Sequence, residues 1–198
     1  PSRGKILLEG KDITGRTPLE INHQGLAGIP PDRINEGLIM DFSVKENLIL
    51  GMHHSKSFQK YGLFNPGAVD RFADQSVKGF DIALQSADQP VRRLSGGNLQ
   101  KVILARELSQ APRVVVASSP TRGLDVGAME FVYSRLIELR SRGAAILLIS
   151  EDLDEIFNVA DVIGVIFKGR IVGVCRVEET TKDQIGLLMA GIHEAAHV

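Results

Sequence analysis

The chain has 198 residues, of which 43% are hydrophobic and 24% charged, and its formal net charge at pH 7 is −1. A chain of this length can bury a core, and its balanced charge argues against nucleic acid or an anionic membrane surface as the main partner. No apolar run approaches the roughly 20 residues that span a bilayer, and the polar stretch Pro1–Gly15 is not typical of a signal peptide.

Capping signals mark three helix starts in the first third of the chain. Thr17–Glu20 and Ser43–Glu46 match the capping box, and Asn65-Pro66 places a cap before a proline at the first helical position. The first predicted helix therefore starts at Pro18, the second runs from Ser43 to about Gly51, and the third starts at Asn65. Later predicted helices are Ala128–Ser141, Leu153–Val159 and Lys182–Ala190. The predicted strands are Lys5–Glu9, Val114–Ala117, Ala145–Ile149, Val162–Phe167 and Ile171–Val174, with a brief apolar stretch at Leu26–Ile29.

The order of these elements predicts the fold class. Strands separated by helices of about ten residues favour a mainly parallel sheet with helices on its faces. The middle of the chain, residues 40–110, is predicted to be helical. The sequence therefore indicates an α/β fold with a helical insertion.

One motif points to anion chemistry. Leu94-Ser95-Gly96-Gly97-Asn98 opens an amphipathic helix, LQKVILARELSQ. Glycines at a helix start let backbone N–H groups approach a ligand, the helix dipole favours an anion there, and Ser95 adds a hydroxyl donor. Taken alone, the Ser-Gly-Gly triplet is better explained by a serine-capped helix that follows a glycine turn.

The wider context of that motif resembles a known family. The blocks are GKDITGRTP, IPPDR, DFSVKENLIL, LSGGNLQKVILARELS, PTRGLDVGA and LLISEDLDEIF. Their order and spacing are similar to those of the ATP-binding cassette (ABC) family, in particular the second cassette of tandem ATPases that serve sugar and nucleoside importers. The resemblance covers nearly the whole chain.

The resemblance implies a P-loop NTPase-like (RecA-like) fold, in which residues 1–198 form one nucleotide-binding domain that lacks the N-terminal Walker A region. Its core would comprise residues 1–39 and 111–198, and its ABC helical subdomain residues 40–110. It also implies ATP and Mg²⁺ as cofactors shared with a partner cassette. The other partners would be membrane permease subunits at the cytoplasmic face of the membrane, with no nucleic acid.

The resemblance also assigns residues to roles. The signature Ser95-Gly96-Gly97-Asn98 would contact the γ-phosphate of a nucleotide held by the other cassette of a head-to-tail pair. Asp125 would cross the interface between the two cassettes. Pro30–Arg33 and Gly37–Asp41 match the region that touches the transmembrane subunit.

A missing motif and four residues depart from the family pattern. The sequence contains no GxxxxGK(S/T) phosphate loop, so either the start has been cut off or this half lacks the loop. Ser118 and Ser119 stand where the family has the Asp that helps to hold Mg²⁺ and the Glu that polarises the attacking water. Glu151 replaces a histidine that would donate toward the γ-phosphate, and Pro31 replaces a polar residue of the interface loop.

These departures predict a degenerate half-site. The chain would complete the partner's active site through Ser95–Asn98, and alone it would not hydrolyse ATP. Three alternatives remain: a conventional active pocket in the full-length protein, a non-transport cassette of DNA repair or translation, and a structural module that binds no nucleotide. A non-transport cassette is expected to carry a coiled-coil insertion or a basic arm, and neither is present; Gly96-Gly97 and Asp125 argue against a structural module.

Other candidate residues have simpler interpretations. His193–His197 matches the zinc-protease pattern HExxH, but a solvated tail is expected because the chain ends one residue later. His53-His54 is expected in a polar loop, and Cys175 as a small core residue whose solitary thiol fits a reducing compartment. Arg92-Arg93 is expected in a solvated loop, with phosphate pairing as the alternative. Acidic residues at 151–155 suit a helix start.

Overall fold

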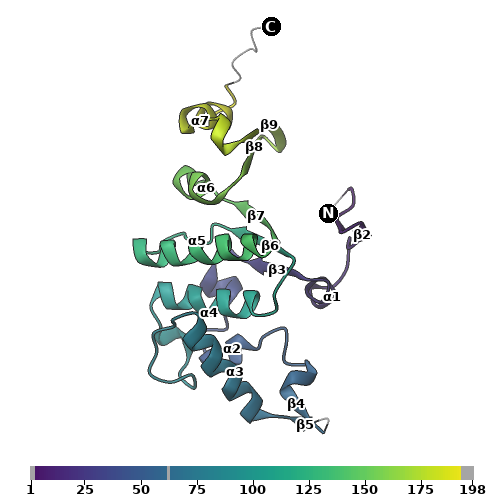
Figure 1. The fold of residues 1–198 in the computed structure, drawn as a ribbon, viewed down its shortest axis with the longest axis vertical. Coiled ribbons are helices and arrows are strands. Elements are labelled where there is room, and N and C mark those ends of the chain that lie inside the picture. The colour runs from purple at the N-terminus through teal and green to yellow at the C-terminus, as the bar shows by residue number, and fades with distance from the viewer. Residues whose placement is uncertain (1–2, 62, 193–198) are drawn as a thin grey trace. The chain divides into compact units, whose positions relative to one another are not determined.

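The computed structural model describes residues 3–61 and 63–192 (Figure 1), so the predicted tail His193–His197 lies outside the described residues. The chain forms two compact units, one up to Ile149 and one from Ser150, and each is described by itself. The predicted division into a core of residues 1–39 and 111–198 and a helical subdomain of residues 40–110 stays a prediction.

Helices and strands lie close to their predicted positions. The helices are α1 (Pro18–His23), α2 (Val44–Leu48), α3 (Pro66–Gly79), α4 (Gly96–Leu108), α5 (Val126–Ser141), α6 (Leu153–Val159) and α7 (Lys182–Met189). The strands are β1 (Leu7–Leu8), β2 (Lys11–Asp12), β3 (Leu26–Ile29), β4 (Gln59–Lys60), β5 (Leu63–Phe64), β6 (Val114–Ser118), β7 (Ala145–Ile149), β8 (Val162–Phe167) and β9 (Arg170–Arg176). Single 3₁₀ turns occupy Lys56–Phe58, Val91–Arg93 and Val177–Glu179, and a π-helical turn occupies Arg33–Gly37.

A parallel sheet in the order β3-β6-β7 organises the first unit. Its central strand, β6, pairs Ala117 with Ile29 on one side and Ser118 with Ile149 on the other. The three carboxyl ends therefore share one edge of the sheet. The predicted α/β class with a mainly parallel sheet is confirmed, and the remaining pairs, β1–β2, β4–β5 and β8–β9, are antiparallel.

Helix α4 is more deeply buried than the predicted amphipathic helix. Val102, Ile103, Leu104 and Ala105 are fully enclosed in the main hydrophobic core, and polar Gln100 is almost as buried. The reason is that α4 packs against β3, α2, α3 and α5, so apolar contacts surround it and do not form one stripe. Only its N-terminal turn, with Ser95 and Gly96, remains exposed.

The predicted capping boxes are formed at both positions. Thr17 and Glu20 cap α1, and Ser43 and Glu46 cap α2. In the second box the Ser43 N–H donates to Glu46 Oε2 at 2.7 Å, and the Glu46 N–H donates to Ser43 Oγ at 3.3 Å. Helix α2 ends at Leu48, earlier than predicted.

The α2 box predicts a pH-dependent stability. Hydrogen bonds from the Ser43 hydroxyl and then its backbone lower the pKa of Glu46. The box therefore contributes fully above the unfolded-state pKa, and this contribution is lost as the pH falls through the lower folded-state pKa. We expect Ser43→Ala to lower the free energy of unfolding by about 1 kcal/mol at pH 7, and by less at acidic pH.

Urea titrations from neutral to acidic pH measure this difference. Ser57→Ala is the matched control, because Ser57 is exposed and its hydroxyl accepts a hydrogen bond from the Ser55 hydroxyl, away from Glu46. A cost of Ser43→Ala that is constant with pH would show that the Glu46 carboxylate contributes nothing to the cap.

The region 40–110 also contains a hairpin that the sequence analysis missed. Strands β4 and β5 pair antiparallel, and Tyr61 at their tip has a positive φ of 55° and is 94% exposed. Each strand has only two residues, which is too short for a recognisable alternation of apolar and polar positions.

The second unit is built on the predicted hairpin. In β8, Ile163 and Val165 are buried with Ile185 of α7, and Cys175 of β9 packs against this small core as predicted. The intervening Lys168 and Gly169 both have positive φ, as a tight two-residue hairpin turn requires. Within the described residues, no helix combines the length and the apolar character that a bilayer crossing demands.

Candidate functional site

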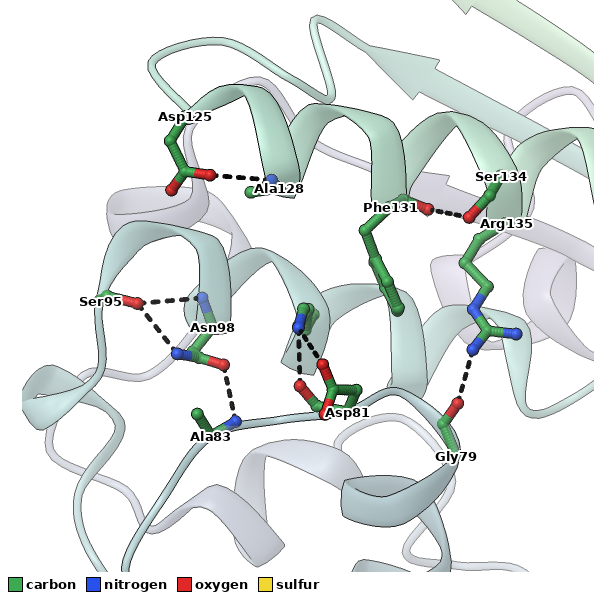
Figure 2. A network of polar contacts seen from close by, with 11 residues as sticks. Gly79, Asp81, Ala83, Ser95, Asn98, Asp125, Ala128, Phe131, Ser134 and Arg135 are labelled. Atoms are coloured by element: carbon green, nitrogen blue, oxygen red, sulfur yellow. Dashed lines mark hydrogen bonds and ion pairs between the residues drawn. The ribbon is translucent and has the colours of Figure 1, made fainter.

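The predicted signature residues lie at the start of α4. The Ser95 Oγ accepts hydrogen bonds from the Asn98 side-chain amide at 2.9 Å and from the Asn98 backbone N–H at 3.4 Å. In turn Asn98 Oδ1 accepts from the Ala83 N–H at 2.8 Å (Figure 2). Because both acceptor positions of the Ser95 hydroxyl are used, its proton is free to be donated to a ligand.

The two signature glycines have different structural roles. A Cβ placed on Gly96 would have no heavy atom within 4 Å, so this backbone faces open space. A Cβ on Gly97 would lie 3.1 Å from the Ala128 Cβ, so Gly97 allows α4 to approach α5 closely. The exposed N–H groups and the helix dipole suit an anion at the open side of this turn.

Asp125 lies beside the signature, although 27 residues of sequence separate it from Asn98. It is the N-cap of α5, and its Oδ1 accepts from the Ala128 N–H at 2.9 Å. Its Oδ2 lies 3.9 Å from the Cβ position of Gly97. The structure therefore brings together the predicted signature residues and Asp125, on the adjacent N-terminal ends of two helices (Figure 2).

The end of the central strand carries hydroxyls. Ser118 is the last residue of β6, and Ser119 follows with a positive φ of 42°, which is uncommon for a residue other than glycine. The Ser119 N–H donates to the Ile149 carbonyl at 2.8 Å and so continues the pairing with β7.

The donor set at this strand end does not fit a resident Mg²⁺. Magnesium prefers carboxylate oxygens, and the described residues include no group of three or more His, Cys, Asp or Glu placed to hold a metal ion. His53 and His54 lie in an exposed loop, as expected, and their ring centroids are 3.8 Å apart at an interplanar angle of 47°.

Glu151 belongs to the second unit, where it is exposed in the bend before α6. The neighbouring Asp152 is the N-cap of α6 and accepts from the backbone N–H groups of Asp154 and Glu155. The expected role of acidic residues at this helix start is confirmed for Asp152. That Glu151 takes the place of a histidine that would donate toward the γ-phosphate stays a prediction.

The predicted interface loop is held by Asp32. Its carboxylate accepts from the backbone N–H groups of Asn35 and Ile34 at 3.0 and 2.9 Å. These bonds, together with the Asn35 side chain, lower the pKa of Asp32. Arg33 donates to the Arg122 carbonyl, which connects the loop to the segment that leads to Asp125.

The segment before the signature is also attached to this loop. The Val91 N–H donates to the Phe42 carbonyl at 3.0 Å, and the Arg92 N–H to the Met40 carbonyl at 3.3 Å. The Arg92 guanidinium forms an ion pair with Asp41. The sequence predicted only a solvated loop or phosphate pairing for Arg92. The partners are 51 residues apart, so no local pattern could have revealed the pair.

A cleft of about 390 Å³ lies elsewhere in the first unit, between α3 and the end of α4. Its lining includes Met52, Phe58, Arg71 and Phe72, and none of the predicted site residues. Ser95, Gly96 and Asp125 are instead exposed at the ends of two helices.

This combination of a parallel α/β core and a glycine-opened helix beside an aspartate-capped helix is that of a nucleotide-binding cassette. The chain belongs to the ABC transporter family, whose family model matches residues 1–122.

Curated relatives are similar over nearly the whole chain. The guanosine import ATP-binding protein NupO of Bacillus subtilis is 43% identical over 188 residues, which are 95% of this chain and 37% of the relative. The ribose import ATP-binding protein RbsA of Oceanobacillus iheyensis is 40% identical over 183 residues, 92% of this chain and 36% of the relative. The chain thus spans little more than a third of the length of these relatives.

Solved ATP-binding cassettes share the fold. One is a dimer in a post-hydrolysis state bound to ADP and phosphate. It is 19% identical with a TM-score of 0.73, and the match covers 89% of this chain and 75% of the solved chain. A second, in its ADP conformation, is 22% identical with a TM-score of 0.68, and the match covers 95% of this chain and 73% of the solved chain. At these identities the likeness supports the fold alone.

Proposed function

We propose that this chain is a cassette of an importer ATPase for nucleosides or sugars, and that it completes a nucleotide site on a partner cassette. The relatives described as guanosine, nucleoside and ribose import ATP-binding proteins support the transport class. The partners would be a cassette with an intact phosphate loop and membrane permease subunits. The chain would sit peripherally at the cytoplasmic face of the membrane.

The observation that carries the proposal is an asymmetry between two places in the first unit. The helix ends with Ser95 and Asp125 present a hydroxyl proton, open backbone N–H groups and a carboxylate side by side. The end of β6 presents two neutral serines where the family has two acids. The groups that would act on a partner's nucleotide are present, and those that would act on the chain's own nucleotide are replaced.

The chemistry of the helix ends that carry Ser95 and Asp125 suits a terminal phosphate. A neutral hydroxyl and helix-end N–H groups donate hydrogen bonds to phosphate oxygens, and the neighbouring Asp125 carboxylate is itself engaged by the Ala128 N–H. When such donors face developing charge in a site that excludes water, they stabilise the transition state. ATP bound between the two cassettes would thus draw them together, and their closure would drive the permease.

The two serines at the end of β6 support low activity in the chain's own pocket. A serine hydroxyl is neutral at pH 7 and is a poor general base. Loss of a general base typically costs about 10²–10⁴ in rate. The printed sequence also contains no GxxxxGK(S/T) motif to hold the β- and γ-phosphates. We therefore expect nucleotide hydrolysis only when the partner cassette contributes its pocket.

A calorimetric titration of MgATP into this chain alone tests the proposal. We expect no detectable heat up to millimolar ATP, because residues 1–198 include no GxxxxGK(S/T) motif to hold the phosphates. Repeating the titration with the partner cassette present should give binding. Micromolar binding to the chain alone would contradict the degenerate half-site.

A further inference from the structure

The turn that follows α3, residues 79–83, is held by side chains from two other helices (Figure 2). Arg135 of α5 donates to the Gly79 carbonyl at 2.7 Å, and the Lys101 ammonium of α4 donates to the Asp81 carbonyl at 2.7 Å and to its carboxylate at 3.0 Å. The Ala83 N–H is bound by Asn98. We call this turn, with Asn98, Lys101, Phe131 and Arg135, the three-helix junction.

The Phe131 ring lies at the centre of the junction. The Lys101 Nζ is 4.7 Å from its centroid and the Arg135 Cζ is 5.0 Å from it. The Arg135 guanidinium also lies 5.2 Å from the Phe80 ring, which meets Phe131 edge to face at 6.5 Å. The Lys101 and Arg135 side chains are only 17% and 29% exposed, so water weakens these cation–ring contacts little.

The junction lies one helical turn beyond the candidate site. Gly97 and Ala128 meet at the N-terminal ends of α4 and α5; Lys101 is four residues after Gly97, and Phe131 three after Ala128. At this spacing the second contact lies on the same helix faces as the first. The two contacts together therefore fix the angle between the helices that carry Ser95 and Asp125.

A small change in that angle moves the site. Ser95 precedes Lys101 by six residues, which is about 9 Å at a rise of ~1.5 Å per residue. A tilt of about 10° at the junction would displace Ser95 by about 1.5 Å on that lever. Misplacement of about 1 Å can cost on the order of a hundredfold in rate.

We propose that Phe131 is a positioning residue: its ring, held between Lys101 and Arg135, sets the placement of Ser95 relative to Asp125 for the partner's nucleotide. This inference rests on the proposed function. It predicts that the electrostatic face of the ring matters as well as its volume, because Phe131 attracts two cations that themselves hold the 79–83 turn.

The test compares Phe131→Leu with Phe131→Tyr in the full-length protein assembled with its partner cassette. Leucine keeps an apolar side chain without the ring face, so the helix angle should change, Ser95 should be displaced and kcat should fall about tenfold. The KM for ATP should change less than about twofold, since the partner's pocket holds the nucleotide. Tyrosine keeps the ring face and should retain kcat.

Phe64→Leu, in the exposed β4–β5 hairpin, is the matched control and should behave as wild type. Arg135→Lys is a second variant, which keeps the charge and loses the planar guanidinium; it should also lower kcat with KM unchanged. Circular dichroism at the assay temperature confirms that each variant is folded. Unchanged kcat in Phe131→Leu, or an equal loss in Phe131→Tyr, would overturn the inference. The proposed function fails separately, if Ser95→Arg retains turnover.

Discussion

Replacing Ser95 with arginine is expected to abolish ATP hydrolysis by the assembled transporter. Ser95 is exposed at the start of α4, and the space beside Gly96 is open. An arginine side chain would fill the volume that a phosphate needs and would remove the hydroxyl donor. Loss of one such donor typically costs about 10²–10³ in kcat, and obstruction of the site adds to that loss.

The fold should survive this substitution. Ser95 also caps α4, and loss of an N-cap costs about 1 kcal/mol, a small part of the stability of a domain. Ser141→Arg, at the exposed far end of α5, introduces the same side chain away from the site and should leave turnover unchanged. Turnover of the assembly is the measurement, and full activity in Ser95→Arg would refute the trans-acting role.

The second large effect is expected from Ile103→Ala. Ile103 is fully buried in α4 beneath the interface loop, and its truncation should lower the free energy of unfolding by about 2–5 kcal/mol. Urea unfolding measures this value. Ile137→Ala on α5 is the control, because its side chain is 40% exposed and should change stability by only about 0.5 kcal/mol.

The neighbour of Ile103 provides a sharper test of this packing. A Cβ on Gly37 would lie 2.6 Å from the Ile103 Cδ1, so Gly37→Ala alone should destabilise the fold by about 1–3 kcal/mol. In the Gly37→Ala, Ile103→Ala double variant the added methyl group enters the space that Ile103 vacates. The free energy of unfolding of the double variant should therefore fall by less than the sum of the decreases in the two single variants. Strict additivity would show that the loop does not rest on Ile103.

Much of the fold could be predicted because its signals are local. The capping boxes at Thr17 and Ser43 and the bounds of β7, α6 and β8 agree with the structure, since caps and short apolar runs depend on neighbouring residues alone. The parallel pairing of β6 with β7 followed from the alternation of strands and helices, whereas Leu26–Ile29, which pairs with β6 as β3, was predicted only as a brief apolar stretch.

The contacts that assemble the site could not be predicted in this way. The pairs Arg92–Asp41 and Arg33–Arg122, and the contact between Lys101 and the Phe131 ring, join residues that are far apart in the sequence. Their side chains have no distinctive spacing. Sequence reasoning therefore identified Ser95 and Asp125 through the family motif, and it missed the residues that hold the two helices together.

The β4–β5 hairpin and the 79–83 turn also differ as places to modify the protein. Both are short connections of polar and apolar residues in the sequence, yet Tyr61 projects into solvent at the hairpin tip and the 79–83 turn is bound by three side chains. A fluorescent label or an affinity tag inserted beside Tyr61 would extend away from the body of the first unit. The same insertion at Asp81 would separate α3 from α4 and α5. The hairpin is therefore the better insertion site for a reporter.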